Sequence, residues 1–450
     1  MKPVFIYATT ITLILTTGTD AAEDTDRVGG RMASDSTAEP APAHLLTLSE
    51  TINKLGFRLF SEVVEKTPAD SNVFISPLAA AYALSVAYNG ASGVTREEIG
   101  ACLELNRLST DTLNGTWRDL MAYITARDSS VEVGLAGSLW TRFDKVLKRG
   151  FIECLSNYGC RHESVDFSCR ATLDTMNAWI SRATRGRIDA VSGEPDASWK
   201  ASVLQNAVYF NGAWKRPFDT ARTARETFHF AGGGERECQL MSLRREDIAE
   251  ITRTRNVRFD PHISCYVPQW LPLPDDCVWL RKTAGVTLPY GSGSFRMTVL
   301  VPYLTYEDSS ATIDTLLDQL TWETWQSTLR LSKKDEFSLW LPKFQLDCTL
   351  SLDEVFQSMG MRSAFQSENA DFSSMFADGV GWIDEVVQTS SIRVNEKGTQ
   401  ACIISTTGWY DSLPADIRAD KPFVIVVHEE STGVILFIGK VANPSWDSES

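Results

Sequence analysis

Signatures of catalysis are scarce in this sequence. Its 450 residues include only five histidines, which are scattered along the chain, and no two of them have the spacing of a metal-binding motif. A nucleophile elbow, a phosphate-binding loop and a dinucleotide fingerprint are missing as well. A catalytic triad assembled from distant residues would leave no local motif, so this test covers contiguous patterns only. On this basis we expect no enzymatic activity, no cofactor and no bound metal.

Positive charge is also in short supply. The chain has 43 lysines and arginines against 58 aspartates and glutamates, which gives a formal net charge of −15 at pH 7. This balance argues against a nucleic-acid partner and against electrostatic binding to anionic membranes. Beyond the N-terminus, no apolar run approaches the ~18 residues that span a bilayer. We therefore expect a partner that is neither nucleic acid nor membrane.

The N-terminus has the pattern of a secretory signal. One positive charge precedes a mainly apolar run over residues 4–15, and small residues lead up to Ala21. This pattern predicts a signal peptide over residues 1–21, cleaved after Ala21, and a secreted, extracellular protein. Residues 22–44 are polar and predicted to be a disordered tail, which disfavours the alternative of a buried N-terminal element. Asn114 begins an Asn-Gly-Thr sequon and is a predicted glycosylation site.

The nine cysteines fit an oxidising compartment. Secretion permits disulfides, and an odd number leaves at least one thiol unpaired within the chain. We expect Cys154 or Cys160 to pair with Cys169, and Cys265 with Cys277, because the members of each pair are close in sequence. The cysteine count alone does not fix this connectivity.

Helical periodicity dominates the first half of the chain and strand patterns dominate the second. Thr47 with Glu50 forms a predicted capping box, and Ser76 before Pro77 predicts a second helix start. Helices are expected over residues 47–66, 78–88, 111–127, 173–184 and 351–361, and strands over residues 203–210, 295–301, 337–341, 423–427 and 434–438. Without a repeating β-α unit, this order predicts an α+β fold with a large mixed or antiparallel sheet. We expect one domain with a tail.

Two segments interrupt this regularity. Residues 251–276 mix arginines and prolines without any period, and we interpret them as an insertion, either a surface loop or an artefact of the gene sequence. Roughly twenty residues between Val394 and Val427 also lack a period, which is long for a connection in a compact domain. Such loops are usually functional or disordered. This one carries Trp409 and Tyr410 near its middle, which predicts that it presents something to a partner.

Several motifs, in a consistent order, resemble those of one family. They lie at residues 72–77, 206–214, 286–290, 341–344, 417–427 and 434–444. Together they make the chain similar to a serpin over about residues 45–444. The resemblance implies a serpin-like fold over residues 45–445, in which a large central mixed sheet is accompanied by smaller sheets and surrounding helices. It also implies an exposed reactive-centre loop over residues 396–420.

The resemblance implies a function as well. Serpins of the inhibitory kind are monomers that trap a target serine protease, because the loop is cleaved and then inserts into the central sheet. By position in the family motifs, the residues implied at the loop hinge are Glu396, Gly398, Thr399 and Ala401. The residues implied in the control of sheet opening are Ser76, Asn206, Trp214, Lys343 and Gln388, with Glu396 and Lys343 as an ion pair.

The usual family register places the reactive bond at Ser412–Leu413, with Tyr410 and Asp411 as alternatives. No lysine or arginine lies near this centre, which favours a chymotrypsin-like or elastase-like target over a trypsin-like one. Bulky residues at 402–404, where inhibitory members keep small ones, favour an alternative. In that alternative the chain is a non-inhibitory serpin that acts as a carrier, a chaperone or a storage protein.

Overall fold

The computed structural model describes residues 40–105, 109–186, 201–244, 264–266, 280, 282–303, 311–331, 337–398 and 415–446. The expected signal peptide and most of the expected tail lie outside the described residues. The same is true of most of the expected insertion and of residues 399–414 in the expected reactive-centre loop. Those expectations stay predictions.

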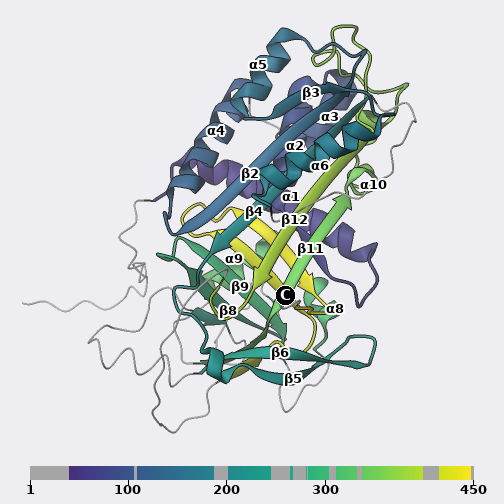
Figure 1. Cartoon of the computed structure of the whole chain (residues 1–450). Helices are drawn as coiled ribbons and strands as arrows, with labels where there is room; N and C mark the ends of the chain where they lie inside the picture. Colours follow the sequence, from purple (N-terminus) through teal and green to yellow (C-terminus); the bar gives the residue numbers. More distant parts are fainter. Residues whose placement is uncertain are drawn as a thin grey trace, which may run out of the picture. The chain divides into compact units, whose positions relative to one another are not determined.

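A five-stranded sheet runs through the middle of Figure 1 in the order β11-β12-β4-β2-β3. The bounds of its strands are β2 Val131–Arg142, β3 Arg161–Val165, β4 Ser202–Gly212, β11 Phe344–Ser351 and β12 Glu385–Val394. β12 runs parallel to β4, whereas β12 with β11 and β2 with β4 are antiparallel. The sheet is therefore mixed, as the sequence pattern predicted.

Two further sheets lie below it in the view of Figure 1. The six-stranded sheet has the order β1-β15-β14-β9-β8-β7 and the four-stranded sheet the order β13-β10-β6-β5. The bounds of the first are β1 Val73–Ile75, β7 Ser264–Tyr266, β8 Thr283–Tyr290, β9 Phe295–Pro302, β14 Phe423–Glu429 and β15 Ile435–Val441. Those of the second are β5 Ala224–His229, β6 Glu235–Leu243, β10 Phe337–Pro342 and β13 Ala415–Arg418. Every residue of β14 and β15 is buried, which explains their continuous apolar runs.

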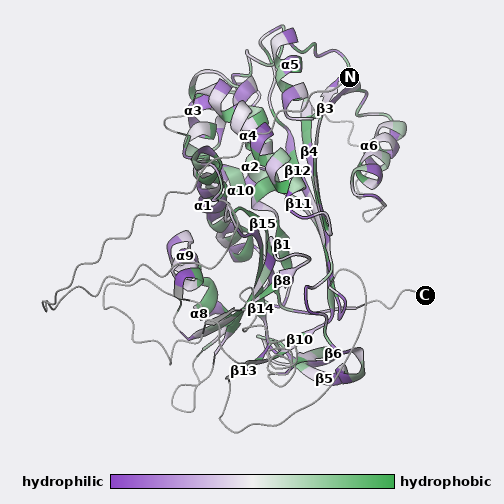
Figure 2. Ribbon diagram, turned by 90° about the vertical axis from the view of Figure 1, so that its left-hand side faces the viewer, coloured by the Kyte–Doolittle hydropathy of each residue, from purple (hydrophilic) through white to green (hydrophobic). Residues whose placement is uncertain are grey.

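Helices cover both faces of the five-stranded sheet. Their bounds are α1 Ala43–Glu65, α2 Pro77–Gly90, α3 Gly93–Cys102, α4 Thr110–Ala126, α5 Arg149–Asn157, α6 Arg170–Ala183, α8 Ile313–Leu317, α9 Trp322–Leu331 and α10 Asp353–Ser358, with short 3-10 turns at Thr220–Arg222 and Ser363–Phe365. Figure 2 shows α1 to α4 on one face and α6 on the other, where Trp179 packs edge-on against Trp140 of β2. Among the described residues, no helix is both long and apolar enough to cross a membrane.

The first helix begins earlier than predicted. α1 opens at Ala43, after Pro42, and Thr47 Oγ1 donates to the carbonyl of Ala43 at 3.2 Å. Thr47 therefore lies inside the helix and does not cap it, so the expected capping box is wrong. Leu45 is buried, and its packing draws the last residues of the expected tail into the helix. The second predicted cap is correct, because Ser76 Oγ accepts a hydrogen bond from Ala79 N at 3.1 Å.

The first predicted disulfide is wrong. Cys154, Cys160 and Cys169 are all free thiols. Cys160 is buried near Tyr82 of α2, and its Sγ donates to the carbonyl of Arg161 at 3.7 Å. Cys169 is exposed at the start of α6, on the opposite face of the sheet. Burial raises the pKa of the Cys154 thiol to about 11, so it is protonated and unreactive at neutral pH. Cys277, in the second predicted pair, lies outside the described residues.

A buried histidine predicts how the stability of this fold depends on pH. His428 of β14 is 2% exposed, between Thr298 of β9 and the ring of Trp325 in α9. Burial, aided by the nearby charge of Arg296, lowers the pKa of His428 to about 3. Below its ordinary pKa of about 6.5, the unfolded chain binds a proton that the folded chain does not. This group should therefore lower the free energy of unfolding by up to about 1.4 kcal/mol per pH unit as the pH falls.

The measurement is the thermal unfolding midpoint at about pH 7 and about pH 5. The wild-type chain should lose more stability over this interval than a His428→Gln variant, whose side chain is neutral at both values. Equal losses in the two proteins would show that His428 does not carry this dependence.

Candidate functional site at the loop hinge

The four residues after β12 form a tight turn, here called the hinge (residues 395–398). Asn395 N donates to Gly398 O and Gly398 N donates to Asn395 O, both at 3.2 Å, which closes a two-residue hairpin turn. Gly398 has a φ of +99°, and a Cβ built on it would lie 2.2 Å from the backbone N of Trp214. Only glycine fits this position. The chain is thus turned back on itself immediately before residue 399.

Gly398 is paired on both sides. It forms antiparallel bridges with Asn395, just after β12, and with Ala213, just after β4. Trp214 N also donates to the carbonyl of Lys397 at 3.2 Å. The hinge therefore enters the space between the ends of β12 and β4, which are neighbouring parallel strands.

A buried ion pair holds the hinge in place. Lys343 Nζ lies 2.8 Å from Glu396 Oε1, and Thr223 Oγ1 donates to the same oxygen at 2.7 Å. Glu396 is 5% exposed. Burial alone would raise the pKa of Glu396, but the hydrogen bonds from Lys343 and Thr223 outweigh it and hold the pKa below its usual value. Phe218 N donates to Glu396 O at 2.8 Å, so both the backbone and the side chain are fixed.

Trp214 covers the hinge from the side of β4. Its ring stacks on Tyr290 of β8 with centroids 4.2 Å apart, and its Nε1 donates to the carbonyl of Asn395 at 3.0 Å. The indole therefore links the hinge to the six-stranded sheet. The sequence motif indicated Trp214, but it gave no sign that Tyr290 and Asn395 belong to the same cluster.

A polar layer lies beneath the sheet, along β12. Ser76 N donates to Gln388 Oε1 at 2.9 Å, and Gln388 Nε2 donates to Ser76 O at 2.8 Å, so β12 is bonded to the start of α2. Asn206 of β4 stands directly opposite Gln388 in the parallel pair. Asn206 Oδ1 and the Ser390 hydroxyl are buried without a hydrogen-bond partner among the described residues. Unsatisfied groups of this kind each cost about 1–3 kcal/mol.

The opposite end of β12 is also held. The carboxylate of Asp384 accepts hydrogen bonds from Ala201 N at 2.5 Å and Ser202 N at 3.1 Å, while Asp384 N donates to Ser202 O at 3.1 Å. Ser202 Oγ donates to the carbonyl of Trp382 at 2.7 Å. Sequence reasoning missed this group of residues, since no local pattern shows that the starts of β4 and β12 meet.

The structure thus brings all five predicted control residues, with two of the predicted hinge residues, into two groups. Lys343, Trp214, Glu396 and Gly398 meet at the hinge, and Ser76, Asn206 and Gln388 meet in the polar layer beneath the sheet. Whether they control sheet opening stays a prediction. The remaining predicted residues, Thr399, Ala401, Tyr410, Asp411, Ser412 and Leu413, lie outside the described residues.

Asn114, the predicted glycosylation site, lies in α4 and is only partly accessible. Its Nδ2 donates to Asn89 Oδ1 at 2.9 Å and to Cys154 Sγ at 3.6 Å, while its Oδ1 accepts from the hydroxyl of Tyr158 at 2.8 Å. A glycan would be attached to that same Nδ2, so it would replace these contacts. Glycosylation stays a prediction.

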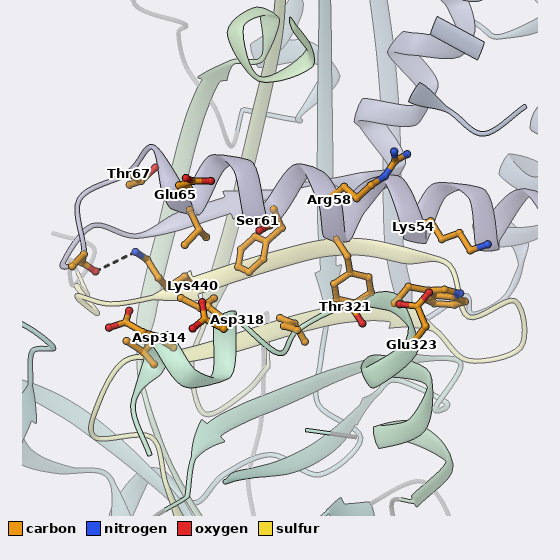
Figure 3. A pocket seen from close by; sticks show the side chains of 18 of the residues that line it. Lys54, Arg58, Ser61, Glu65, Thr67, Asp314, Asp318, Thr321, Glu323 and Lys440 are labelled. Carbon is orange, nitrogen blue, oxygen red and sulfur yellow. Dashed lines mark hydrogen bonds between the residues drawn. The ribbon is translucent and has the colours of Figure 1, made fainter. Parts of the chain in front are cut away.

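A separate cavity of about 930 Å³ opens between α1 and the pair α8 and α9. Figure 3 shows Lys54 and Arg58 on α1 above it, Asp314 of α8 and Asp318 just after α8 opposite, and Lys440 of β15 between them. Its apolar lining is provided by Phe57, Phe60, Val64, Leu317 and Trp322. An apolar lining with a charged rim is typical of sites for small organic ligands.

Comparison with known proteins identifies the family. The family described as "Serpin (serine protease inhibitor)" matches residues 50–260 and 279–444. Iripin-3 from Ixodes ricinus is 26% identical over 414 residues, covering 88% of this chain and 94% of that protein. Plasminogen activator inhibitor 1 from Bos taurus is 28% identical over 396 residues, covering 86% of this chain and 90% of that protein.

Solved structures agree on the fold. Human thyroxine-binding globulin complexed with thyroxine has a TM-score of 0.76 and 22% identity, and the match covers 90% of this chain and 100% of that one. At this identity the likeness shows the fold alone. With a family match over most of its length and this fold, the chain belongs to the serpin family.

Proposed function

We propose that this serpin is a secreted suicide inhibitor of a chymotrypsin-like or elastase-like serine endopeptidase. The observation that carries the proposal is Gly398, which is already paired to the ends of both β12 and β4. A strand that continues from Gly398 after cleavage could therefore enter between β12 and β4 and separate them. The relative named plasminogen activator inhibitor 1 supports inhibition, though not a particular target.

The strand registers support insertion of the loop at this point. Continuing the Asn395–Gly398 bridge residue by residue puts Gly408 opposite Glu385 of β12. Continuing the Ala213–Gly398 bridge puts Gly408 opposite Val203 of β4. Glu385 and Val203 are partners in the existing β12–β4 ladder, so the two counts agree. Residues 399–408 can therefore run antiparallel to both strands without a slip in register.

Insertion should also lower the free energy of the sheet. One parallel ladder would be replaced by two antiparallel ones, which are slightly more stable per residue. In the extrapolated register Ser405 lies level with Gln388 and Asn206 and faces the same side. Its hydroxyl could then donate to the unpaired Asn206 Oδ1. The five-stranded form would be a metastable state that holds free energy for trapping.

The reaction itself belongs to the protease. Its catalytic serine attacks the carbonyl of Ser412, or of Tyr410 or Asp411, and forms an ester to the loop while the peptide bond to the next residue breaks. Water would next hydrolyse that ester. Insertion must come first, pulling the attached protease along the sheet and distorting its active site. The yield of trapped enzyme is then set by two competing rates.

The N-terminal pattern supports secretion, with cleavage after Ala21, and the sequon supports a glycan on Asn114. We propose action as a monomer, since the loop needs to reach only its own sheet.

The first test is incubation with chymotrypsin, elastase and trypsin, followed by denaturing electrophoresis and mass spectrometry of the released peptide. We expect denaturant-resistant complexes with chymotrypsin or elastase and a released peptide that begins at Leu413 or within about two residues of it. A stable complex with trypsin formed through this centre would contradict the proposed specificity.

Residue 399 offers a matched control pair. In the extrapolated register Thr399 lies opposite the buried Val394, so a charged side chain there would have to enter the sheet. A Thr399→Arg variant should be cleaved at the same bond without forming complexes, whereas Thr399→Ser should trap as the wild type does. Undiminished trapping by Thr399→Arg would argue against insertion at this register.

The hinge ion pair gives a second prediction. Loss of the Lys343 partner leaves Glu396 buried without its counter-charge and should destabilise the five-stranded form by about 1–3 kcal/mol. A Lys343→Met variant should therefore convert faster to an uncleaved, heat-stable form with the loop inserted. The conversion is measured at neutral pH as the fraction that resists heating. An unchanged conversion rate would show that the pair does not hold the hinge.

A lower pH should also speed the conversion of the wild-type chain to the form with the loop inserted. Because the pKa of Glu396 is lowered in the folded chain, its stabilisation is complete above the ordinary glutamate value of about 4.5. This stabilisation is lost as the pH falls through the lowered pKa that Glu396 has in the folded chain. A Glu396→Gln variant should lack this acid-dependent part of the conversion.

The cavity between α1 and α9 favours a second candidate function, that of a carrier. Its volume and apolar lining suit a small organic ligand, and the structurally similar globulin is described as complexed with thyroxine. A neutral fluorescent dye such as Nile red is a suitable probe. Dye binding should be lost in Leu317→Glu, which places a charge in the lining, and kept in Leu46→Glu, at an exposed position outside the cavity. Equal dye binding by both variants would count against a ligand site here.

A further inference from the structure

We propose that a small phosphate-type oxyanion binds beside the hinge ion pair. The site is formed by Arg225, Gln239 and Lys343, here called the anion row. A ligand bound there would loosen the hold on Glu396 and so make insertion of the loop sensitive to that ligand. The effect on insertion rests on the proposed function, whereas binding to the anion row does not.

Three adjoining stretches of chain place the anion row in one line. In the antiparallel ladder of β5 and β6, Arg225 lies directly opposite Gln239. On the other side of β6, the ladder with β10 ends at Pro342–Leu240, and Lys343 N then donates to Gln239 O at 2.8 Å. Residues directly opposite each other in an antiparallel sheet point to the same face, with Cβ atoms about 4.5–5.5 Å apart. The guanidinium, the amide and the ammonium group therefore lie side by side.

Two cavities open beside the anion row, and all three of its side chains line both of them. The larger cavity, of about 430 Å³, extends to Glu396 at the hinge. The smaller one, of about 230 Å³, is bounded by residues 444–446, where the ring centroid of Trp446 lies 5.5 Å from Lys343 Nζ. Both are several times larger than the roughly 30 Å³ that one water molecule occupies, so a small anion fits with part of its hydration shell.

The charges around these cavities favour an anion. The charged residues that line them are Arg225, Arg236, Lys343, Glu237 and Glu396. Because Lys343 and Glu396 pair with each other, two arginines remain against Glu237. In the part of the chain that the structure describes, neither the Arg225 guanidinium nor the Gln239 amide has a side-chain hydrogen bond. In a chain with a net charge of −15, this local excess of positive charge indicates an anionic ligand.

The donor groups of the anion row suit a tetrahedral oxyanion. The planar guanidinium of Arg225 can donate to two oxygens of one phosphate group at once, which a point charge cannot do. The ammonium group of Lys343 and the amide NH2 of Gln239 can donate to the remaining oxygens. A carboxylate has only two oxygens and would leave part of this donor set unused. Inorganic phosphate is therefore the probe.

Glu396 couples the site to the hinge. Its Oε1 lies 2.8 Å from Lys343 Nζ, so a bound anion and the Glu396 carboxylate would share one ammonium group and repel each other. The anion therefore binds more tightly when Glu396 has left its place. By linkage, a bound anion favours release of Glu396 to the same extent. Phosphate should thus speed conversion to the form with the loop inserted, in the same direction as loss of the Lys343 charge.

The direct test is a phosphate titration of the full chain followed by phosphorus NMR at neutral pH, with sodium chloride added to hold the ionic strength constant. We expect a dissociation constant on the order of 1 mM for so small a ligand. Arg225→Met should weaken binding about tenfold, whereas Arg170→Met, at an exposed arginine where α6 begins, should leave it unchanged. Glu396→Gln should tighten binding, because it removes the repulsion. Both arginines are exposed, so folding should be unaffected by their replacement.

A functional measurement complements the titration. The fraction that resists heating is followed over time in phosphate at about ten times the measured dissociation constant, and in sodium chloride of equal ionic strength. Conversion of the wild-type chain should be about fivefold faster in phosphate. Arg225→Met should convert at the same rate in both salts, and Arg170→Met should respond as the wild type does.

The outcomes separate this inference from the proposed function. Equal phosphate binding by Arg225→Met and Arg170→Met would indicate an adventitious ion only and overturn the site. Unchanged affinity in Glu396→Gln, or an unchanged conversion rate in a chain that traps proteases, would overturn the coupling and leave inhibition standing. Phosphate binding that depends on Arg225, in a chain that forms no stable complex with any protease, would support the site and overturn the proposed function.

Discussion

The parallel ladder between β12 and β4 sets the geometry of the hinge and of the polar layer beneath the sheet. Parallel neighbours can accept an antiparallel strand between them, and the ladder that the proposed insertion would open is short, from Glu385–Val203 to Ser391–Tyr209. The ladder is held mainly at its two ends. At one end the Asp384 carboxylate accepts hydrogen bonds from the backbone N–H groups of Ala201 and Ser202 at the start of β4, and at the other end Glu396 is fixed by Lys343 and Thr223. Because Gly398 already lies between the strands at the hinge end, opening should begin there and the contacts of Asp384 should yield last.

The polar layer under β12 explains why such a sheet would be poised to change. Gln388 and Ser76 satisfy each other, but Asn206 Oδ1 and the Ser390 hydroxyl remain without partners among the described residues. Apolar side chains of similar size would make the five-stranded form more stable. Under the proposed function the sheet later admits a sixth strand, and unsatisfied groups would favour that step because they raise the free energy of the state before insertion. The unpaired Asn206 Oδ1 and Ser390 hydroxyl would also favour the one register in which an entering hydroxyl, such as that of Ser405, can hydrogen-bond to them.

Apolar residues on both faces made β4, β14 and β15 predictable from the sequence, since each of these strands is buried on both sides. The same reasoning missed β12, whose middle residues Gln388 to Ser391 are polar and nevertheless buried. It missed β2 because glycines interrupt the pattern: at Gly134 a Cβ would lie 2.0 Å from the ring of Tyr209. At the site, family motifs indicated Glu396 and Lys343. The hairpin bonds of Asn395 and the role of Asp384 depend on which strand ends meet, and periodicity along one segment contains no such information.

Register also bears on the one feature of the loop that favoured a carrier, its bulky residues at 402–404. Continued from the hinge, Ile403 lies level with Ser390 on β12 and Val208 on β4. Ser390 is small, and the α2 helix on that face is rich in alanine, with Ala79, Ala80 and Ala83 all buried. A larger side chain entering at this level therefore faces small neighbours, and β-branched residues favour the extended conformation that a new strand requires. Bulk in the loop and small residues in the sheet are complementary, so these residues are compatible with a trap and do not by themselves mark a carrier.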